Sequence, residues 1–421
     1  MSRLLCDFKG GKCELIGTKK LLTEGSVVCD CEIYNAGDLR KKYGIASSED
    51  VKFLSELVGK VGLSVLDEVD GVYSLAYYGR DAIFLARDLI GLKPMWYSLE
   101  RGLAFGFVKN DLEKLGYKKI EELNPRNIFR YDVKEGEVSF VKRSFFSIKP
   151  QLKDSENVIV KNLSDLFVAA VKKRVPKKKF AVSFSGGIDS TLIALVCKKL
   201  GCDFTCYTSH FSHPGMEASQ DLFHAQKVAK SLGFRLEVVE VDAKKTELIL
   251  SRIVPLIGAD AVKVGVALPF FAACEQARKD KLDTIFSGLG SEEIFAGYRR
   301  HKLSSNLNEE CLLGLLHMYE RDTYRDYIVG DLNSMKVETP FLDNALVDYS
   351  LKIPSSLKLR DGVEKFIIRR VALSLGLPDE FAWRKKKAAQ YGSNSDKMLA
   401  KLAKKSGFKF KHDYLKTFLK V

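Results

Sequence analysis

The sequence predicts an α/β protein in which a parallel sheet covered by helices follows a smaller, sheet-rich domain. Two observations lead to this fold class. Up to about residue 145, short runs of β-branched and aromatic residues alternate with Gly and Asp, as in a succession of strands. After residue 150, short apolar runs are separated by segments of helical periodicity, which is typical of a parallel sheet with crossover helices. We therefore expect two domains, residues 1–148 and 149–421.

The first domain is expected to be mostly strands with one clear helix. A helix is predicted over 48–61, because its apolar residues between Val51 and Val58 recur at helical spacing. The strand-like runs, each rich in β-branched or aromatic residues, are 26–29, 72–78, 82–86 and 102–107.

The second domain begins with a predicted helix over 155–175 and a strand over 180–184. Similar apolar runs recur at 204–209, 235–241 and 282–287, and we expect them to be further strands. The last hundred residues are predicted to be mostly helical. The most apolar long stretch, 253–273, contains Asp260, Lys263 and Pro269, which a membrane span tolerates badly. We expect this stretch to be buried core, and we expect no membrane partner.

Composition excludes several protein classes and leaves one question about charge. The chain has 421 residues, of which 46% are hydrophobic and 29% charged, so a disordered chain, a collagen and a coiled-coil rod are excluded. The net charge is +14, and residues 382–421 hold 12 Lys+Arg against 2 Asp+Glu. A basic tail of this kind suits nucleic acid, anionic lipid or a phosphate-bearing substrate, or it is a solvated lysine-rich face.

The most informative segment is Ser185-Gly186-Gly187-Ile188-Asp189-Ser190, which lies between a predicted strand and a predicted helix. Glycines without Cβ atoms let backbone N–H groups and a helix N-terminus approach an anion. The serines can donate further hydrogen bonds. The Asp189 carboxylate would repel phosphates unless a divalent metal lies between them. The loop therefore indicates binding of ATP with Mg²⁺, although it is not a Walker A loop.

The S-G-G-x-D-S pattern resembles the loop of the N-type ATP pyrophosphatases, and a second segment narrows the resemblance. Ser287 to Tyr298 reads S-G-L-G-S-E-E-I-F-A-G-Y, which is similar to the S-G-E-G-(S/A)-D-E-(L/V)-F-G-G-Y segment of asparagine synthetases. The resemblance extends over residues 27–392. The further matching segments, in chain order, are Glu32-Ile33-Tyr34-Asn35, Asp70-Gly71, Phe84 to Asp88, Gly91 to Pro94, Asp221 with Ala225 to Ala229, Asp260, Pro269, Pro340 to Asp343, Lys365 with Arg369, and Trp383 to Lys386.

The resemblance implies a fold and a set of roles. It implies a PP-loop ATP pyrophosphatase domain preceded by a truncated, degenerate glutaminase domain of the Ntn-hydrolase-like α+β type. Asp189 and Glu292 match the two acids that hold Mg²⁺, and Glu292 is one methylene longer than the usual Asp. Lys386 matches the lysine that neutralises charge on the α-phosphate and pyrophosphate. The residues implied in ATP binding are Ser185, Gly186, Gly187, Asp189, Ser190 and Gly288.

Two departures from the family pattern change the expected chemistry. Leu289 stands where the family has a Glu that handles the amine or the intermediate, so either Glu293 takes that role or the acceptor differs. In the glutaminase half, Ser2 replaces the Cys nucleophile, and the family's R-G-P-D region is missing. Asp30-Cys31 replaces N-G, and Ser48 replaces an Asp. We therefore expect no glutaminase nucleophile and no glutamine hydrolysis.

These observations predict a cytoplasmic, AMP-forming amide ligase that uses ATP and Mg²⁺. Its expected substrates are a small carboxylic acid, aspartate by default, and ammonia or another amine. Two alternatives stay open, namely a PP-loop enzyme that adenylates a tRNA and a non-catalytic ATP-binding scaffold. A nucleic-acid partner is not expected, because Lys385 to Lys387 fall at the pyrophosphate site and the eight lysines from Lys397 to Lys420 suit a surface helix. A homodimer is allowed.

Overall fold

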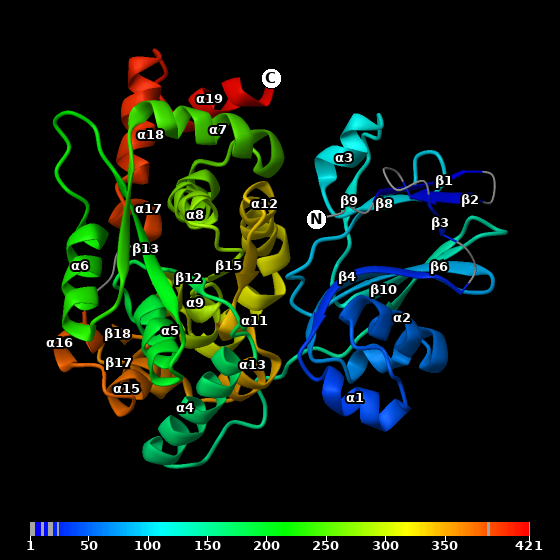
Figure 1. Cartoon of the computed structure of the whole chain (residues 1–421), viewed down its shortest axis with the longest axis horizontal. Coiled ribbons are helices and arrows are strands. Elements are labelled where there is room, and N and C mark those ends of the chain that lie inside the picture. The colour runs from blue at the N-terminus through cyan, green and yellow to red at the C-terminus, as the bar shows by residue number, and fades with distance from the viewer. Residues whose placement is uncertain (1–4, 10–11, 16–19, 23–24, 385–387, 421) are drawn as a thin grey trace. The chain divides into compact units, whose positions relative to one another are not determined.

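The structure is a computed structural model that describes residues 5–9, 12–15, 20–22, 25–384 and 388–420. Its strands pair antiparallel in the first part of the chain, and the large sheet of the second part is parallel. The chain divides into two compact units, Met1–Phe145 with His317–Tyr327 and Phe146–Leu316 with Ile328–Val421 (Figure 1). The α/β fold class and the sheet-rich first domain predicted from the sequence are confirmed.

The first unit contains two antiparallel sheets and the helices α1, α2 and α3. One sheet has the strand order β3-β2-β1-β8-β7-β9, and the other has the order β11-β10-β6-β5-β4. A core between the sheets contains Phe105 and Phe129, and a second core under the helices contains Phe53 and Leu75. The elements are β1 (Leu5–Lys9), β2 (Lys12–Leu15), β3 (Lys20–Leu22), β4 (Val27–Ile33), α1 (Ala36–Tyr43), α2 (Asp50–Val61), β5 (Gly71–Tyr78), β6 (Ala82–Arg87), β7 (Trp96–Ser98), β8 (Ala104–Gly106), α3 (Lys109–Lys114), β9 (Glu121–Glu122), β10 (Asn127–Asp132) and β11 (Val138–Lys142).

A distant segment, His317–Tyr327, completes the first unit, which differs from the division expected at residue 148. Thr323 Oγ1 donates to Gly91 O at 2.8 Å, and the Tyr324 ring packs edge-on against Trp96. The Arg87 guanidinium lies over the Tyr319 ring. Such long-range contacts leave no local signal in the sequence.

The second unit is organised by a five-stranded sheet with the order β14-β13-β12-β15-β16, in which every pairing is parallel. The chain runs from β12 outward to β14, and then returns to β15 on the other side of β12. The strand order therefore reverses between β12 and β15, and the crevice at the carboxyl ends of such strands is where open α/β sheets bind ligands. The loops that begin at Phe184 and Ser287 start from these two ends.

Helices surround this sheet, and α8 contacts β12, β13 and β14. The apolar stretch 253–273 forms the end of α7 and most of α8, and most of its apolar residues are buried, as predicted. The elements of the second unit are α4 (Glu156–Lys172), β12 (Phe180–Ser183), α5 (Ile188–Lys199), β13 (Phe204–Phe211), α6 (Gln220–Leu232), β14 (Leu236–Val241), α7 (Ala243–Ile257), α8 (Ala261–Lys279), β15 (Thr284–Phe286), α9 (Ser291–Phe295), α10 (Arg299–Leu303), α11 (Leu307–Leu316), α12 (Tyr324–Leu332, shared with the first unit), β16 (Lys336–Glu338), α13 (Asn344–Leu351), α14 (Ser355–Lys358), β17 (Leu359–Arg360), β18 (Val363–Glu364), α15 (Phe366–Ser374), α16 (Asp379–Ala382), α17 (Ala389–Gly392), α18 (Ser395–Lys405) and α19 (Lys411–Lys416).

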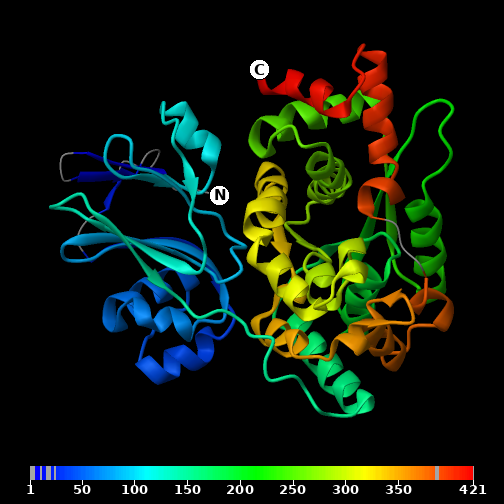
Figure 2. The same ribbon diagram turned by 180° about the vertical axis from the view of Figure 1, so that it is seen from behind.

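The basic C-terminal segment forms amphipathic helices. In α18, Met398, Leu399 and Leu402 are buried, whereas Lys397 and Lys404 on the same helix are exposed. The helices α18 and α19 pack at the α7–α8 end of the unit (Figure 1 and Figure 2). Among the described residues, no helix is both long enough and apolar enough to cross a bilayer.

A buried ion cluster ties the loop before β12 to the segment around β16. Arg174 Nη1 donates to Asp343 Oδ2 at 2.8 Å, and Arg174 Nε lies 3.8 Å from Glu338 Oε2. All three side chains are at most 3% exposed. Removing one partner of a buried pair is costly because it leaves a charge in a low-dielectric interior.

We expect Arg174→Met to lower the free energy of unfolding of the second unit by about 3 kcal/mol, because Asp343 and Glu338 would stay buried with less compensation. Urea titration with amide hydrogen exchange read over β16 and α13 measures this loss. Arg278→Met, at an exposed arginine of α8, is the matched control and should change stability by less than about 0.5 kcal/mol. Equal stability of the two variants would contradict the assignment.

Candidate active site

The loop after β12 is held against α6 by a glycine. Gly186 has a φ of +64°, and a Cβ atom there would lie 2.8 Å from the backbone nitrogen of Ala225. A side chain at this position would clash with backbone, and the left-handed conformation also favours glycine. The loop backbone can therefore lie directly on α6.

Hydroxyl groups shape the rest of this loop. Ser185 N donates to Ser190 Oγ at 3.3 Å, and Gly187 N donates to Ser185 Oγ at 3.4 Å. The 12-residue helix α5 begins at Ile188, so its free N–H groups and positive dipole end lie at the loop. This arrangement of backbone donors suits a phosphate group.

The loop after β15 lies beside the first loop. A Cβ atom on Gly288 would lie 3.1 Å from Asp189 Cβ, so the two loops approach closely at this point. The short helix α9 then starts at Ser291, and Ser291 Oγ donates to Asp189 Oδ1. Sites at residues 189 and 291, which are 102 positions apart, are thus brought together by neighbouring strands of one sheet.

Lys365 is the centre of the charged cluster at these loops. Its Nζ lies 2.8 Å from both Asp189 carboxylate oxygens, 2.9 Å from Ser291 Oγ and 3.0 Å from Glu292 Oε1. Burial alone would lower the pKa of the Lys365 ammonium, but Asp189 and Glu292 outweigh burial and raise that pKa above its usual value. The lysine is therefore a permanent cation between the two acids.

The backbone is adapted to bring Lys365 into this position. Lys365 has a φ of +57°, which is uncommon for a residue with a side chain and costs about 1–2 kcal/mol. A Cβ atom on Gly297 would lie 2.4 Å from Lys365 Cε, so glycine at this position leaves room for the lysine chain. Local strain of this kind persists only where the surroundings fix it, and it concentrates at functional sites.

Asp189 and Glu292 could hold one divalent cation together. Both carboxylates reach a single cation, the Lys365 ammonium, within 3.0 Å, so their separation fits a shared metal ion. Within the described part of the chain, no cluster of three or more His, Cys, Asp or Glu side chains could hold a metal. Mg²⁺ commonly binds through one or two carboxylates and completes its shell with water and substrate phosphates, so two acids suffice here.

Arg384 fixes the first loop from the other side. Its Nη1 donates to Gly186 O at 3.0 Å, and its Nη2 lies 3.3 Å from the buried Asp221 carboxylate at the start of α6. Arg369 in α15 in turn donates through Nη1 to Arg384 O at 3.0 Å and to Ala382 O at 2.5 Å. These contacts position the chain just before residue 385. Lys386, the lysine expected beside the pyrophosphate, lies outside the described residues.

Glu293 is turned away from the Lys365 cluster. It is 1% exposed, and its Oε1 accepts a hydrogen bond from Tyr298 Oη at 2.7 Å. Its Cγ packs against α11, where a Cβ atom on Gly314 would lie 3.3 Å away. Nearby, burial and the charge of Arg300 lower the pKa of His301 to about 4, so this imidazole is neutral at neutral pH.

Leu289 lies between Gly288 and Gly290 in the loop after β15 and is half-buried. Its N–H donates to Ser287 Oγ at 3.3 Å, and its side chain has no polar atom to assist proton transfer. In the first unit, the Asp30 carboxylate pairs with Lys93 Nζ at 2.9 Å. Cys29 and Cys31 lie with their sulfurs 3.7 Å apart. Ser2 lies outside the described residues.

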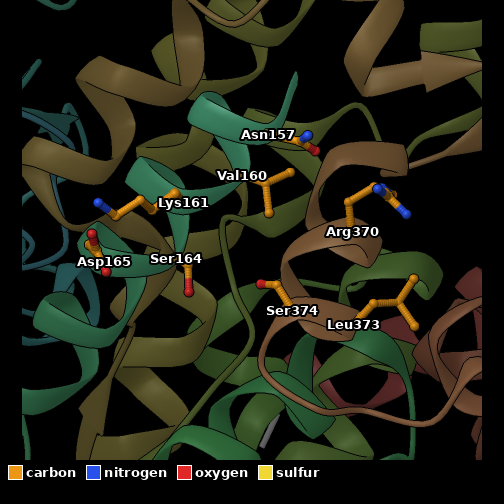
Figure 3. Close-up of a pocket in the computed structure, with 8 residues that line it drawn as sticks. All are labelled: Asn157, Val160, Lys161, Ser164, Asp165, Arg370, Leu373 and Ser374. Carbon is orange, nitrogen blue, oxygen red and sulfur yellow. The ribbon is translucent and has the colours of Figure 1, made fainter. Parts of the chain in front are cut away.

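The site residues do not line the surface hollow between α4 and α15. This hollow has a volume of about 550 Å³, and the residues that line it include Lys161 and Asp165 of α4 and Arg370 and Ser374 of α15 (Figure 3). It contains neither loop residues nor members of the Lys365 cluster. The loops at the sheet edge, rather than this hollow, mark the candidate site.

The sequence predicted that Asp189 and Glu292 lie together beside the ATP-binding loop. It assigned no role to four residues that the structure places there, namely Lys365, Ser291, Arg384 and Asp221. All four residues stand in segments that match the family, and this was the signal available. The contacts of Lys365 with Asp189 and of Arg384 with Ser185 and Asp221 span 163 to 199 positions, so no local pattern could reveal them.

Comparisons with known proteins show the family to which the chain belongs. Residues 162–311 and 303–409 match the family described as "Asparagine synthase", and residues 19–112 match the "Glutamine amidotransferase domain". A Methanocaldococcus jannaschii relative that carries the name of a glutamine-hydrolyzing asparagine synthetase is 29% identical, with 91% of this chain and 80% of the relative covered. The asparagine synthetase of Gallus gallus is 28% identical over 91% of this chain and 74% of its own length.

Two of the solved structures similar to the chain are nucleotide-handling enzymes of low sequence identity. An NMN synthetase from Francisella tularensis has a TM-score of 0.32 at 12% identity, covering 64% of this chain and 94% of that protein. The family matches are far more specific. Because the synthetase match extends over more than half of the sequence, the chain belongs to the asparagine synthase family, the ATP-using, AMP-forming ligases that make carbon–nitrogen bonds.

Proposed function

We propose that this protein is an ammonia-using amide ligase that activates a small carboxylic acid, aspartate by default, as an acyl-adenylate with the aid of Mg²⁺. The observation that supports this most directly is the cluster of Asp189, Glu292 and Lys365 beside the Ser185–Ser190 loop. Charges of both signs converge there at the edge of a parallel sheet, next to backbone donors suited to phosphate.

In the first step, a carboxylate oxygen of the acid attacks the α-phosphorus of ATP, and pyrophosphate leaves. The N–H groups at the start of α5 bind the phosphates, and Arg384 fixes the loop by donating hydrogen bonds to the Ser185 and Gly186 carbonyl oxygens. Asp189 and Glu292 would hold Mg²⁺, which supplies charge neutralisation for the leaving pyrophosphate. Lys386 is placed by its sequence position to share that neutralisation.

In the second step, ammonia attacks the acyl carbon, AMP leaves, and the nitrogen loses a proton. The family's glutamate at this position is Leu289 here, so the proton passes to solvent or to a group other than residue 289. The buried, α11-facing position of Glu293 favours a supporting role for that residue over contact with the substrate. Because Leu289 lacks the carboxylate of the family's glutamate, an acid other than aspartate is also a candidate substrate.

The first unit supports the choice of ammonia over glutamine. Asp30, at the position of the family's Asn, has its carboxylate engaged by Lys93, so a charged pair stands where an amide is expected. Cys6, the cysteine nearest the start of the sequence, is 0% exposed in the core between the sheets and is disulfide-bonded. Neither feature suits a thiolate nucleophile, which must be accessible and ionised.

Asp189→Asn and Lys386→Ala should each lower ATP-dependent pyrophosphate release at least about a hundredfold, because charge at the phosphates would lose its compensation. The assay contains ATP, Mg²⁺, aspartate and ammonium chloride. Asp165→Asn, at an exposed acid of α4, is the matched control and should retain the parent rate. Turnover near the parent rate in either site variant would refute the site assignment.

Ammonium should support amide formation, and glutamine at the same concentration should not. Free glutamate, measured after incubation with glutamine and the complete assay mixture, should stay at the no-enzyme level. A glutamine-hydrolyzing relative assayed in parallel is the positive control. Glutamate release that matches amide formation would overturn the proposed nitrogen source.

Arg384→Met should raise the KM for ATP about tenfold or more, because a charge-assisted contact to the loop is worth roughly 1.5–3 kcal/mol. Arg384→Lys should restore the KM for ATP only in part, since one ammonium cannot reach both Gly186 O and Asp221. Arg299→Met, at an exposed arginine, serves as the control. An unchanged KM in Arg384→Met would exclude the loop-positioning role.

A further inference from the structure

The Lys365 ammonium fills the position that one shared cation would take between Asp189 and Glu292. Four oxygens surround its Nζ within 3.0 Å, and they belong to Asp189, Ser291 and Glu292. An ammonium has three protons, so these contacts use its full donor capacity. Any metal ion that bound the same carboxylates would compete with the lysine for them.

The lysine is built into this position rather than lying there by chance. Its side chain is 7% exposed and that of Asp189 is 5% exposed, so neither charge can turn freely into water. Gly297 leaves space for Lys365 Cε, and the left-handed backbone at residue 365 directs the chain there. The backbone and the packing around residue 365 therefore fix this arrangement.

The charge balance of the cluster depends on whether phosphates are present. Asp189, Glu292 and Lys365 together carry −1. A divalent cation added to the same group would bring it to +1 and would place two cations against one pair of carboxylates. Phosphate oxygens supply the negative charge and the further ligands that both cations need.

We propose that Lys365 is an internal counter-cation that keeps divalent metal off Asp189 and Glu292 until the metal arrives with ATP. When phosphates enter, the ammonium moves its hydrogen bonds toward them, and the two carboxylates become available to the metal. The site thereby discriminates against free metal ions and couples metal binding to nucleotide binding. This inference rests on the proposed function only in taking Asp189 and Glu292 as the metal ligands.

The test measures Mn²⁺ binding by electron paramagnetic resonance on the full chain, without turnover. The parent protein should bind Mn²⁺ weakly alone and at least about tenfold more tightly with α,β-methylene-ATP, whose α–β bridge cannot be cleaved. Lys365→Met, which keeps the length and removes the charge, should bind Mn²⁺ without nucleotide about 10- to 100-fold more tightly than the parent protein. The difference between its two Mn²⁺ affinities, with and without nucleotide, should shrink.

Two further variants make the result specific. Lys302→Met removes a lysine that pairs with Glu364 and does not contact the cluster, so its Mn²⁺ affinity should equal that of the parent. The double variant Lys365→Met with Glu292→Gln should lose the gained affinity, because it removes one proposed ligand. Circular dichroism checks that each variant is folded.

Equal nucleotide-free Mn²⁺ affinity in Lys365→Met and the parent would overturn the proposal. If Lys365→Met does not fold, the parent protein still decides the matter, because equal Mn²⁺ affinity with and without the ATP analogue would also overturn it. Neither measurement needs a reaction. Absence of pyrophosphate release with every acid tested would count against the proposed function alone.

Discussion

The attraction between one lysine and two carboxylates, gathered from three distant segments, is the constraint on which the candidate active site depends. Asp189 begins a helix after one central strand, Glu292 follows the neighbouring strand, and Lys365 comes from the start of α15. Burying such charges is costly unless each finds its partner at short range. The sheet order provides that condition, because β12 and β15 are neighbours and their carboxyl ends open on the same crevice.

Close backbone packing is the second requirement of the same site. Gly186 lets the first loop lie on α6, and Gly297 leaves room for the lysine chain. Arg384 then connects the first loop to Asp221, and Arg369 connects Arg384 to α15. The helix that presents Lys365 therefore also holds the segment leading to Lys386.

The sequence predicted much of this architecture, and the gaps have physical causes. The predicted helix corresponds to α4 and the four predicted strands of the second domain correspond to β12 to β15, namely 155–175 for the helix and 180–184, 204–209, 235–241 and 282–287 for the strands. They were found because short apolar runs and helical periodicity are strong local signals. The two loops were found because glycine and acid spacing is also local. The contact between Lys365 and Asp189 could not be found, because it joins residues 176 positions apart. The packing of His317–Tyr327 into the first unit could not be found either, because this segment lies far along the chain from the rest of that unit.

If the protein uses ammonia as proposed, the first unit keeps its fold without needing the residues of a glutaminase. Its two cores, one between the sheets and one under α1 and α2, are filled by side chains such as Phe105, Phe129 and Phe53, none of which belongs to a glutaminase nucleophile or its partners. Arg87 is fully buried, and it is satisfied by Glu122 and by the carbonyls of Gly91, Lys93 and Leu123. In the proposed ammonia-using enzyme, the change to Asp30 is accommodated because Lys93 neutralises the new carboxylate. Loss of glutamine hydrolysis would therefore remove no interaction on which the stability of this unit rests.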